Sequence, residues 1–191
     1  MEGFLGQVYP LPEFTPLAAD RSLELGGRLW RTIAAPGHAF GQRMLHDEAS
    51  GDLICGDHVL PQITPNVGLL PRFDENPLRS YLRSLEETAA LRVATAYPGH
   101  REPFAGFSER CRDIVGHHRE RLARMLAMLE QPATGYEVCL AFFGRSLSIH
   151  QLRFAMAETL AHLVYLREEG QAREVEADAG SEPARIAYVR V

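Results

Sequence analysis

The sequence predicts an α+β fold built in two parts. As far as residue 105, short apolar runs alternate with turns rich in Gly, Asp and Pro, which indicates strands accompanied by one helix. After residue 107, apolar residues recur at helical spacing over long stretches, and two strand-like pieces follow at the end. We therefore expect a sheet-containing domain at residues 1–107 and a helical domain with a terminal β-hairpin at residues 108–191.

The first part is expected to contain five strands and a single helix. After an extended lead-in at residues 1–20, the strands are predicted at Ser22–Leu25, Leu29–Ala34, Gln42–His46, Leu53–Cys55 and Arg92–Tyr97. Residues 58–75 contain several prolines and form a loop of the length often seen in lids and binding loops. Asn76 can cap the helix that follows, and Pro77 suits its first turn.

The second part follows the order of a winged-helix domain. A long helix is predicted at Ser108–Glu130, where apolar residues line one side. Thr134 and Ser148 each begin a capping box that opens a further helix. The hairpin is expected from strand-like pieces at residues 173–176 and 185–191, on either side of a turn at residues 178–181.

Composition points to a globular protein without a nucleic-acid surface. Of the 191 residues, 46% are hydrophobic and 24% are charged, which is usual for folded domains. The net charge is -5, whereas a protein that binds nucleic acid normally presents a basic face. Residues 118–191 carry nine Arg against ten Asp and Glu, so the winged-helix part is acidic too. We expect this part to pack or to dimerise, and nucleic-acid binding is the less favoured alternative.

Cysteine content and the lack of long apolar runs predict a cytoplasmic location. Three cysteines far apart make a poor disulfide framework, which is typical of a reducing compartment. Residues 1–10 lack the regions of a signal peptide, and no run reaches the roughly 18 apolar residues of a membrane span. We therefore expect no membrane partner. Cys55, within an apolar run, is expected to be a buried thiol rather than a metal ligand.

Three residues have the chemistry of a metal site: His38, Asp57 and His100. Each follows an apolar run and lies on a turn that contains Gly or Pro. Imidazole and carboxylate groups at strand ends are suitable ligands for zinc. Two alternatives stay open, namely a vestigial site that keeps this geometry without a metal and three turn residues that share no site.

The remaining histidines are weaker candidates. His58 directly follows Asp57, so it is expected either near the substrate on the loop or as a solvated loop residue. His117 and His118 are adjacent on a helix and point to different faces, so they cannot bind one ion together. We expect both at the surface, and we expect His162 to be structural.

The segments that carry these residues resemble the metallo-β-lactamase superfamily. Ala35–Gly41 (A-P-G-H-A-F-G) resembles the T-P-G-H-x-x-G-H segment of that family, with Gln42 in place of its second histidine. Leu53–Asp57 resembles the strand-G-D segment, and Tyr97–His100 resembles the last P-G-H. The run G-D-H-V-L-P, followed by I-T-P-N at Ile63–Asn66, resembles the branch related to the lactamase-β-like 2 proteins, as does the winged-helix tail.

The resemblance implies a metal-dependent hydrolase with an αββα sandwich. His38 would bind the first of two divalent metals, Asp57 would bridge both, and His100 would bind the second. Zinc is the expected metal. In such hydrolases the metals lower the pKa of a bound water from about 16 to about 7 and polarise the scissile carbonyl or phosphoryl group. The substrate class stays open among esters, thioesters and phosphodiesters, because fold does not fix function.

The sequence departs from the family pattern in one important respect. It contains no H-x-H-x-D-H motif, which supplies the other ligands from an N-terminal half in that family. We therefore expect the chain to be the C-terminal portion of such a hydrolase, with half of the sandwich followed by the winged-helix tail. Alone, its three candidate ligands would hold at most one metal loosely, or none, and the chain would be inactive.

A half-sandwich has a second expected consequence. Its sheet would expose an apolar face larger than a monomer normally tolerates, so we expect self-association or poor solubility. The alternative to a hydrolase is accordingly a non-catalytic fragment, which forms a homo-oligomer or pairs with a separate N-terminal half.

Overall fold

An antiparallel meander with one added parallel strand forms the first half of the structure. The computed structural model describes residues 13, 15–70, 72–177 and 185–191. Within these residues, a five-stranded sheet has the order β1-β2-β3-β4-β5. Its strands are β1 (Ser22–Leu25), β2 (Arg28–Ala34), β3 (Arg43–Asp47), β4 (Asp52–Gly56) and β5 (Thr95–Pro98). Neighbours from β1 to β4 are antiparallel, whereas β5 runs parallel to β4.

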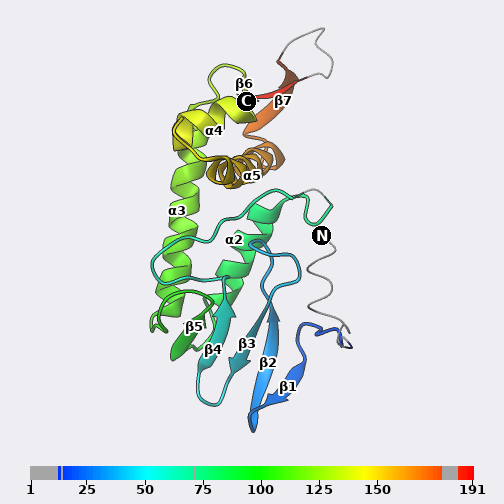
Figure 1. The fold of residues 1–191 in the computed structure, drawn as a ribbon, viewed down its shortest axis with the longest axis vertical. Coiled ribbons are helices and arrows are strands. Elements are labelled where there is room, and N and C mark those ends of the chain that lie inside the picture. The colour runs from blue at the N-terminus through cyan, green and yellow to red at the C-terminus, as the bar shows by residue number, and fades with distance from the viewer. Residues whose placement is uncertain (1–12, 14, 71, 178–184) are drawn as a thin grey trace.

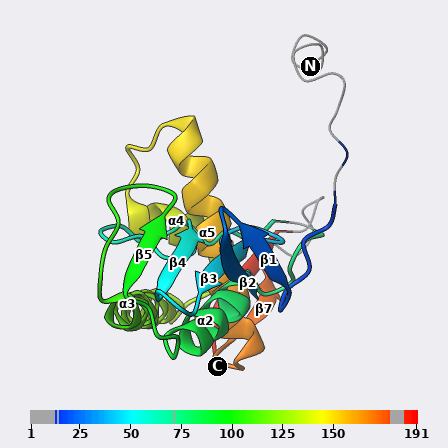
Figure 2. The same cartoon turned by 90° about the horizontal axis from the view of Figure 1, so that it is seen from below.

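Helices α2 (Pro77–Thr88) and α3 (Phe107–Ala127) lie on one face of this sheet, as Figure 2 shows. Successive side chains of a strand point to opposite faces. Leu53 and Ala96 are paired in register and fully buried. Ile54 and Tyr97 form the next pair, point to the opposite face, and remain 38% and 39% exposed. The sheet therefore has one packed face, and its other face is open around Ile54 and Tyr97.

The helical part begins within the long helix α3. This helix runs beside the sheet at one end and reaches α5 (Ile149–Glu168) at the other, with α4 (Gly135–Phe143) between them in the chain (Figure 1). A three-stranded antiparallel sheet of order β6-β8-β7 completes this part. Its strands are β6 (Ala133–Thr134), β7 (Ala172–Glu176) and β8 (Ile186–Arg190). Among the described helices, none has the combination of length and apolar character that crossing a bilayer would require.

The local helix signals are confirmed. Asn76 caps α2, since its Oδ1 accepts a hydrogen bond from the N–H of Arg79 at 3.0 Å. Thr134 and Ser148 open α4 and α5, each with a complete capping box. The predicted strands form with ends shifted by a few residues, and the short strand β6 was not predicted. Most of the predicted lead-in at residues 1–20 and the whole predicted turn at residues 178–181 lie outside the described residues.

One cluster of buried apolar side chains runs from the sheet into the helical part. It includes Leu53 and Leu85 in the first part and Leu163 and Tyr188 in the second. Helix α3 supplies side chains to this cluster along much of its length, and it packs on both α2 and α5. The predicted division between residues 107 and 108 falls in the first turn of α3. That division and the winged-helix assignment stay predictions.

His118 is fully buried, which corrects the expectation of a surface residue. Its Nδ1 lies 3.1 Å from Nε2 of His162 on α5, and that ring is fully buried as well. The reason lies in the helical spacing, because position 118 falls between Val115 and Leu122 on the stripe of α3 that faces the core.

Candidate metal centre

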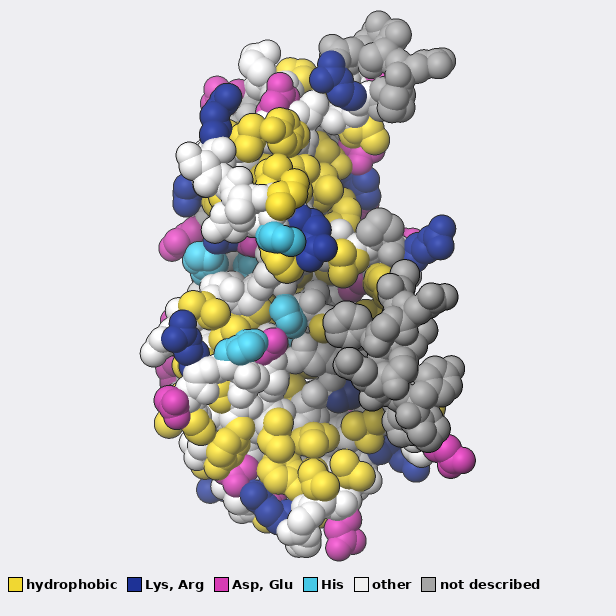
Figure 3. Space-filling view, viewed as in Figure 1, with side chains coloured by type: hydrophobic (Ala, Val, Ile, Leu, Met, Phe, Trp, Pro, Cys, Tyr) yellow, Lys and Arg dark blue, Asp and Glu magenta, His cyan; other side chains and the backbone are white. Residues whose placement is uncertain are grey.

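The turns after β2, β4 and β5 meet at one edge of the sheet. β4 and β5 are parallel, and β2 runs in the direction of β4 because each is antiparallel to β3. The carboxyl ends of these strands therefore lie together, and the turns after them carry His38, Asp57 and His100. Figure 3 shows histidine side chains and an acidic side chain gathered near the middle of the molecule, where the sheet meets the helical part. The structure brings all three candidate ligands together.

Asp57 lies between the two imidazoles. Its Oδ2 is 3.7 Å from Nε2 of His38 and 3.6 Å from Nε2 of His100. Two ligands of a tetrahedral zinc ion, each about 2.1 Å from the metal, are about 3.4 Å apart, so both separations are close to those of ligand pairs. The His38 and Asp57 side chains are 27% and 31% exposed, and the His100 side chain is 68% exposed. The site is therefore open to solvent on the side of His100.

The donor set, two imidazoles and a carboxylate, suits a divalent metal. Oδ1 of Asp57 is buried and has no hydrogen-bond partner among the described residues, which is costly unless another group satisfies it. No group of three or more His, Cys, Asp or Glu side chains among those residues is arranged to hold a metal ion by itself. Each imidazole instead pairs with Asp57 separately. Both imidazoles therefore lie near the same carboxylate oxygen.

Gly99 allows the close approach of the Asp57 and His100 turns. A Cβ atom at Gly99 would lie 2.3 Å from Oδ1 of Asp57, a separation that real Cβ atoms do not adopt. The N–H of Gly99 also donates to the carbonyl of Gly56 at 2.9 Å. Only glycine fits at this position of the P-G-H segment, because the backbone directly contacts the carboxylate of Asp57.

Gly37 has the corresponding role before His38. Its φ is +113°, a conformation that side chains rarely adopt. A Cβ atom at this position would lie 2.3 Å from Cβ of Tyr81 on α2. The turn that precedes His38 is therefore packed directly against the helix.

A backbone carbonyl sets the orientation of the His38 ring. Nδ1 of His38 lies 2.8 Å from the carbonyl oxygen of Asn66. A carbonyl can only accept, so Nδ1 carries a proton, and Nε2 is left on the side of Asp57. Metal-binding histidines are commonly held in this way through their second nitrogen. The sequence did not single out Asn66 as a residue of the site. Its contact with His38 is made by a backbone carbonyl, which every residue has, so no residue pattern indicates it.

His58 is buried rather than solvated, which corrects one of the two expectations, while its place near the substrate stays a prediction. Its side chain is fully buried, Nε2 lies 3.1 Å from Oγ of Ser84, and the ring packs edge-on against Tyr81. The Tyr81 hydroxyl donates to the His58 carbonyl at 2.7 Å. Burial lowers the pKa of His58 to about 3, so the ring is neutral. The apolar residues that follow draw this end of the loop inward, and His58 fastens it to α2.

Gln42 and Cys55 support the Asp57 turn without being ligands. Nε2 of Gln42, where the family pattern has a histidine, donates to the carbonyl of Cys55 at 3.2 Å. Cys55 is fully buried, as predicted, and burial raises the pKa of its thiol to about 12. The thiol therefore stays protonated at neutral pH and is a poor metal ligand.

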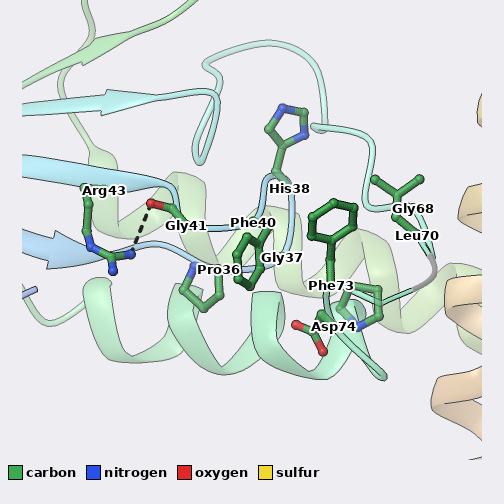
Figure 4. A pocket seen from close by; sticks show the side chains of 11 residues that line it. Pro36, Gly37, His38, Phe40, Gly41, Arg43, Gly68, Leu70, Phe73 and Asp74 are labelled. Atoms are coloured by element: carbon green, nitrogen blue, oxygen red, sulfur yellow. Dashed lines mark hydrogen bonds between the residues drawn. The ribbon is translucent and has the colours of Figure 1, made fainter. Parts of the chain in front are cut away.

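A pocket of about 260 Å³ opens beside His38. Figure 4 shows Phe40, Leu70 and Phe73 along it, together with the polar side chains of Arg43 and Asp74. The centroids of the Phe40 and Phe73 rings are 5.4 Å apart. A largely apolar wall with few polar groups, next to candidate metal ligands, has the composition of a small-molecule site.

Two family models match the chain in consecutive segments. The model described as "Metallo-beta-lactamase superfamily" matches residues 2–100, which contain all three candidate ligands. The model described as "Metallo-beta-lactamase-like, C-terminal domain" matches residues 122–182, which contain α4 and α5. The two matches therefore fall on the sheet-containing part and on the helical part.

Curated relatives and solved structures agree with these matches. "Probable metallo-hydrolase YqjP" of Bacillus subtilis is 31% identical over 145 residues, which cover 73% of this chain and 45% of that protein. A metallo-beta-lactamase family protein from Thermus thermophilus superposes with a TM-score of 0.82 and 40% identity, over 96% of this chain and 56% of that one. A beta-lactamase domain protein from Burkholderia ambifaria superposes with a TM-score of 0.86 and 34% identity, over 94% of this chain and 53% of that one.

These relatives are longer than the chain described here. The chain spans about half the length of the proteins that it matches, at 45% of the first curated relative and 56% of the first solved structure. The agreement of motif, strand-end geometry and family match over more than half of the residues leads to one assignment. The chain belongs to the metallo-beta-lactamase superfamily.

Proposed function

We propose that this chain is the C-terminal portion of a metal-dependent hydrolase, in which His38, Asp57 and His100 are ligands. One observation carries the proposal: Oδ2 of Asp57 lies within 3.7 Å of both imidazoles while its Oδ1 has no partner among the described residues. Membership of this superfamily implies a divalent metal, and we propose zinc, because two imidazoles and a carboxylate are the ligand types it favours.

The residues of the site have separable tasks in this proposal. His38 is held by the Asn66 carbonyl and would bind one metal, His100 would bind the second, and Asp57 would bridge them. When bound, the metal supplies a water of lowered pKa and polarises the bond to be cut. The side chain of His100 is 68% exposed, so this flank of the site leaves room for a substrate and for further ligands.

The pocket beside His38 indicates the kind of substrate. Phe40, Leu70 and Phe73 offer an apolar surface to one side of the candidate ligands. We propose an ester, thioester or phosphodiester substrate whose apolar group lies in this pocket. His38 lines both this pocket and a neighbouring hollow that contains Asp57 and His100, so a group bound here would lie beside the candidate ligands.

His38, Asp57 and His100 would hold at most one metal, weakly, in this chain, so a complete site needs more ligands. We propose that an H-x-H-x-D-H segment outside the 191 residues supplies them, and that the chain alone is inactive. We further propose a cytoplasmic protein and a winged-helix fold for residues 108–191. The order of α3, β6, α4, α5, β7 and β8 supports that fold, and its acidic charge supports a packing role over nucleic-acid binding.

Hydrolysis by the protein isolated from its native source tests this proposal. A carboxylic ester, a thioester and a phosphodiester are assayed before and after treatment with a chelator. We expect one class to be cleaved, with activity lost on chelation and restored by zinc. Asp57→Asn should lower it about 100-fold or more, since losses even outside the ligands cost 10–100-fold. Asp113→Asn, an exposed position on α3, is the matched control. Activity that survives both the chelator and Asp57→Asn would refute the proposal.

A non-catalytic role is the second candidate, and the open face of the sheet favours it. Ile54 and Tyr97 lie side by side on that face and are each more than a third exposed. Exposed apolar side chains in one row are typical of a surface that another chain covers. The occupant would be a second copy of this chain or a separate N-terminal half.

A further inference from the structure

Asn66 makes hydrogen bonds in two directions. Its backbone carbonyl accepts from Nδ1 of His38 at 2.8 Å, while its side-chain Nδ2 donates to Oε2 of Glu158 at 2.8 Å. Glu158 lies on α5, 92 positions further along the chain. A single residue therefore links a candidate metal ligand to the helical part.

Glu158 is buried and fully engaged. Only 8% of the residue is exposed. Its Oε1 pairs with the guanidinium of Arg121 on α3, and its backbone carbonyl accepts from Nδ1 of His162. A buried carboxylate is retained at low cost only when its oxygens are paired in this manner. Removal of either partner of Glu158 would leave a buried charge unsatisfied.

The loop beyond Asn66 is also fixed to α5. The N–H of Leu69 donates to the carbonyl of Ala157 at 2.9 Å. A Cβ atom at Gly68 would lie 2.9 Å from Cβ of Ala157, so this segment lies directly on the helix. The position of the Asn66 carbonyl is thus determined by α5 rather than by the sheet that carries His38.

We infer that Asn66, Glu158 and Arg121 form a clamp that positions His38 for metal binding. The inference rests on the proposed function, because it takes His38 as a ligand. In a metal site, the acceptor at the second nitrogen of a histidine sets its tautomer and ring orientation. Here that acceptor is held through Asn66 by an ion pair between two helices of the C-terminal part. Glu158 is therefore a positioning residue, and the helical part acts on the metal site.

The variant Asn66→Asp tests the clamp. It keeps the backbone carbonyl and the side-chain shape, but it replaces the Nδ2 donor with an oxygen that faces Glu158. Nitrogen-15 spectra of the metal-free chain, taken where imidazole is neutral, report which nitrogen of His38 carries the proton. We expect protonation at Nδ1 in the wild type and a mixture of tautomers in the variant. Zinc affinity should fall about 10-fold, as for other groups that orient ligands.

A second substitution should restore the contact with reversed polarity. In Asn66→Asp combined with Glu158→Gln, the new amide can donate to the new carboxylate, so the Nδ1 tautomer and the zinc affinity should return. Glu169→Gln is the matched control, because it removes an ion pair between the end of α5 and Arg79 on α2 without touching the loop. If Asn66→Asp does not fold, Asn66→Ala removes the donor without adding charge.

The results separate the clamp from the proposed function. An unchanged His38 tautomer in the folded Asn66 variants would overturn the clamp, whatever happens to zinc. A shifted tautomer that the second substitution restores would establish it. Failure of the wild-type chain to bind zinc would instead count against the proposed function, while the nitrogen-15 spectra would still decide the clamp.

Discussion

At the scale of single residues, the site depends as much on glycine as on its candidate ligands. Gly99 leaves no room for a Cβ atom next to Oδ1 of Asp57, and Gly37 leaves none next to Tyr81. These contacts give a physical reason for the P-G-H segments: the turn must approach its neighbour more closely than any side chain permits.

Gly99→Ala should weaken metal binding more than folding. The added methyl group must displace the Asp57 carboxylate, so we expect zinc affinity to fall about 10-fold, in the range seen when ligand-orienting groups are lost. Competition with a chromophoric chelator measures it. Gly116→Ala is the control, since a Cβ there has nothing within 4 Å and should add about 1 kcal/mol of helix stability. Equal zinc affinity of Gly99→Ala and the wild type would contradict the steric account.

The sequence predicted the three candidate ligands because their signals are local. A polar residue after an apolar run and a Gly turn marks a strand end, and His38, Asp57 and His100 all show this pattern. The expectation of a solvated His58 was wrong because nothing in the neighbouring sequence reveals that its ring is buried against Tyr81. Glu158 had no signal, since its partners lie on other elements.

At the scale of elements, the capped helices were predictable and the sheet order was not. Asn76, Thr134 and Ser148 make hydrogen bonds within one turn of their own helices, so the sequence contains both partners. Strand β6 has two residues, and it exists because β8 pairs with it across more than 50 positions. Such long-range pairing has no local signature.

The contact between α3 and α5 predicts a pH dependence of stability. His118 donates to His162, which donates to the carbonyl of Glu158. Burial lowers the pKa of both rings to about 3, and the charge of Arg121 lowers both further, as the charge of His162 does for His118. The unfolded chain binds these protons below a pKa of about 6.5. Their contribution is therefore complete above pH 6.5 and is lost as the pH falls toward 3.

Chemical denaturation at pH 7 and pH 5 measures this effect. We expect the free energy of unfolding to decrease by about 2 kcal/mol for each histidine over this interval. The double variant His118→Leu/His162→Leu removes both partners of the hydrogen bond, a change that is often tolerated. Its free energy of unfolding should decrease less between pH 7 and pH 5 than that of the wild type. The same decrease in the variant and the wild type would show that the pair does not titrate on unfolding.

At the scale of the whole molecule, one face of the sheet is packed, and the other is open over β4 and β5. Helices α2 and α3 bury the row that contains Leu53 and Ala96, whereas Leu45, Ile54 and Tyr97 form a row on the other face. Figure 3 shows apolar side chains gathered over the strands on this open side. The exposed apolar face was predicted only from the resemblance to the family. The alternation of apolar and polar residues in such short strands does not indicate which face of the sheet is covered.

Charge placed in the open row should prevent self-association. Ile54→Asp should shift the chain toward monomer in sedimentation equilibrium, because a carboxylate in a buried interface is strongly unfavourable. Leu29→Asp is the matched control, since Leu29 is 65% exposed and lies outside this row. A wild-type chain that is monomeric at all concentrations would rule out a second copy as the occupant, and equal effects of both variants would rule out this row as the interface.

Metal binding by His38, Asp57 and His100 can be measured as the metal content of the purified chain. Elemental analysis is carried out on the wild type, on the double variant His38→Ala/His100→Ala, and on the control His150→Ala, which replaces an exposed histidine at the start of α5. The account predicts zinc or another divalent metal in the wild type and the control, and its loss in the double variant. Metal that stays in the double variant would contradict it, because residues other than His38 and His100 would then hold the ion.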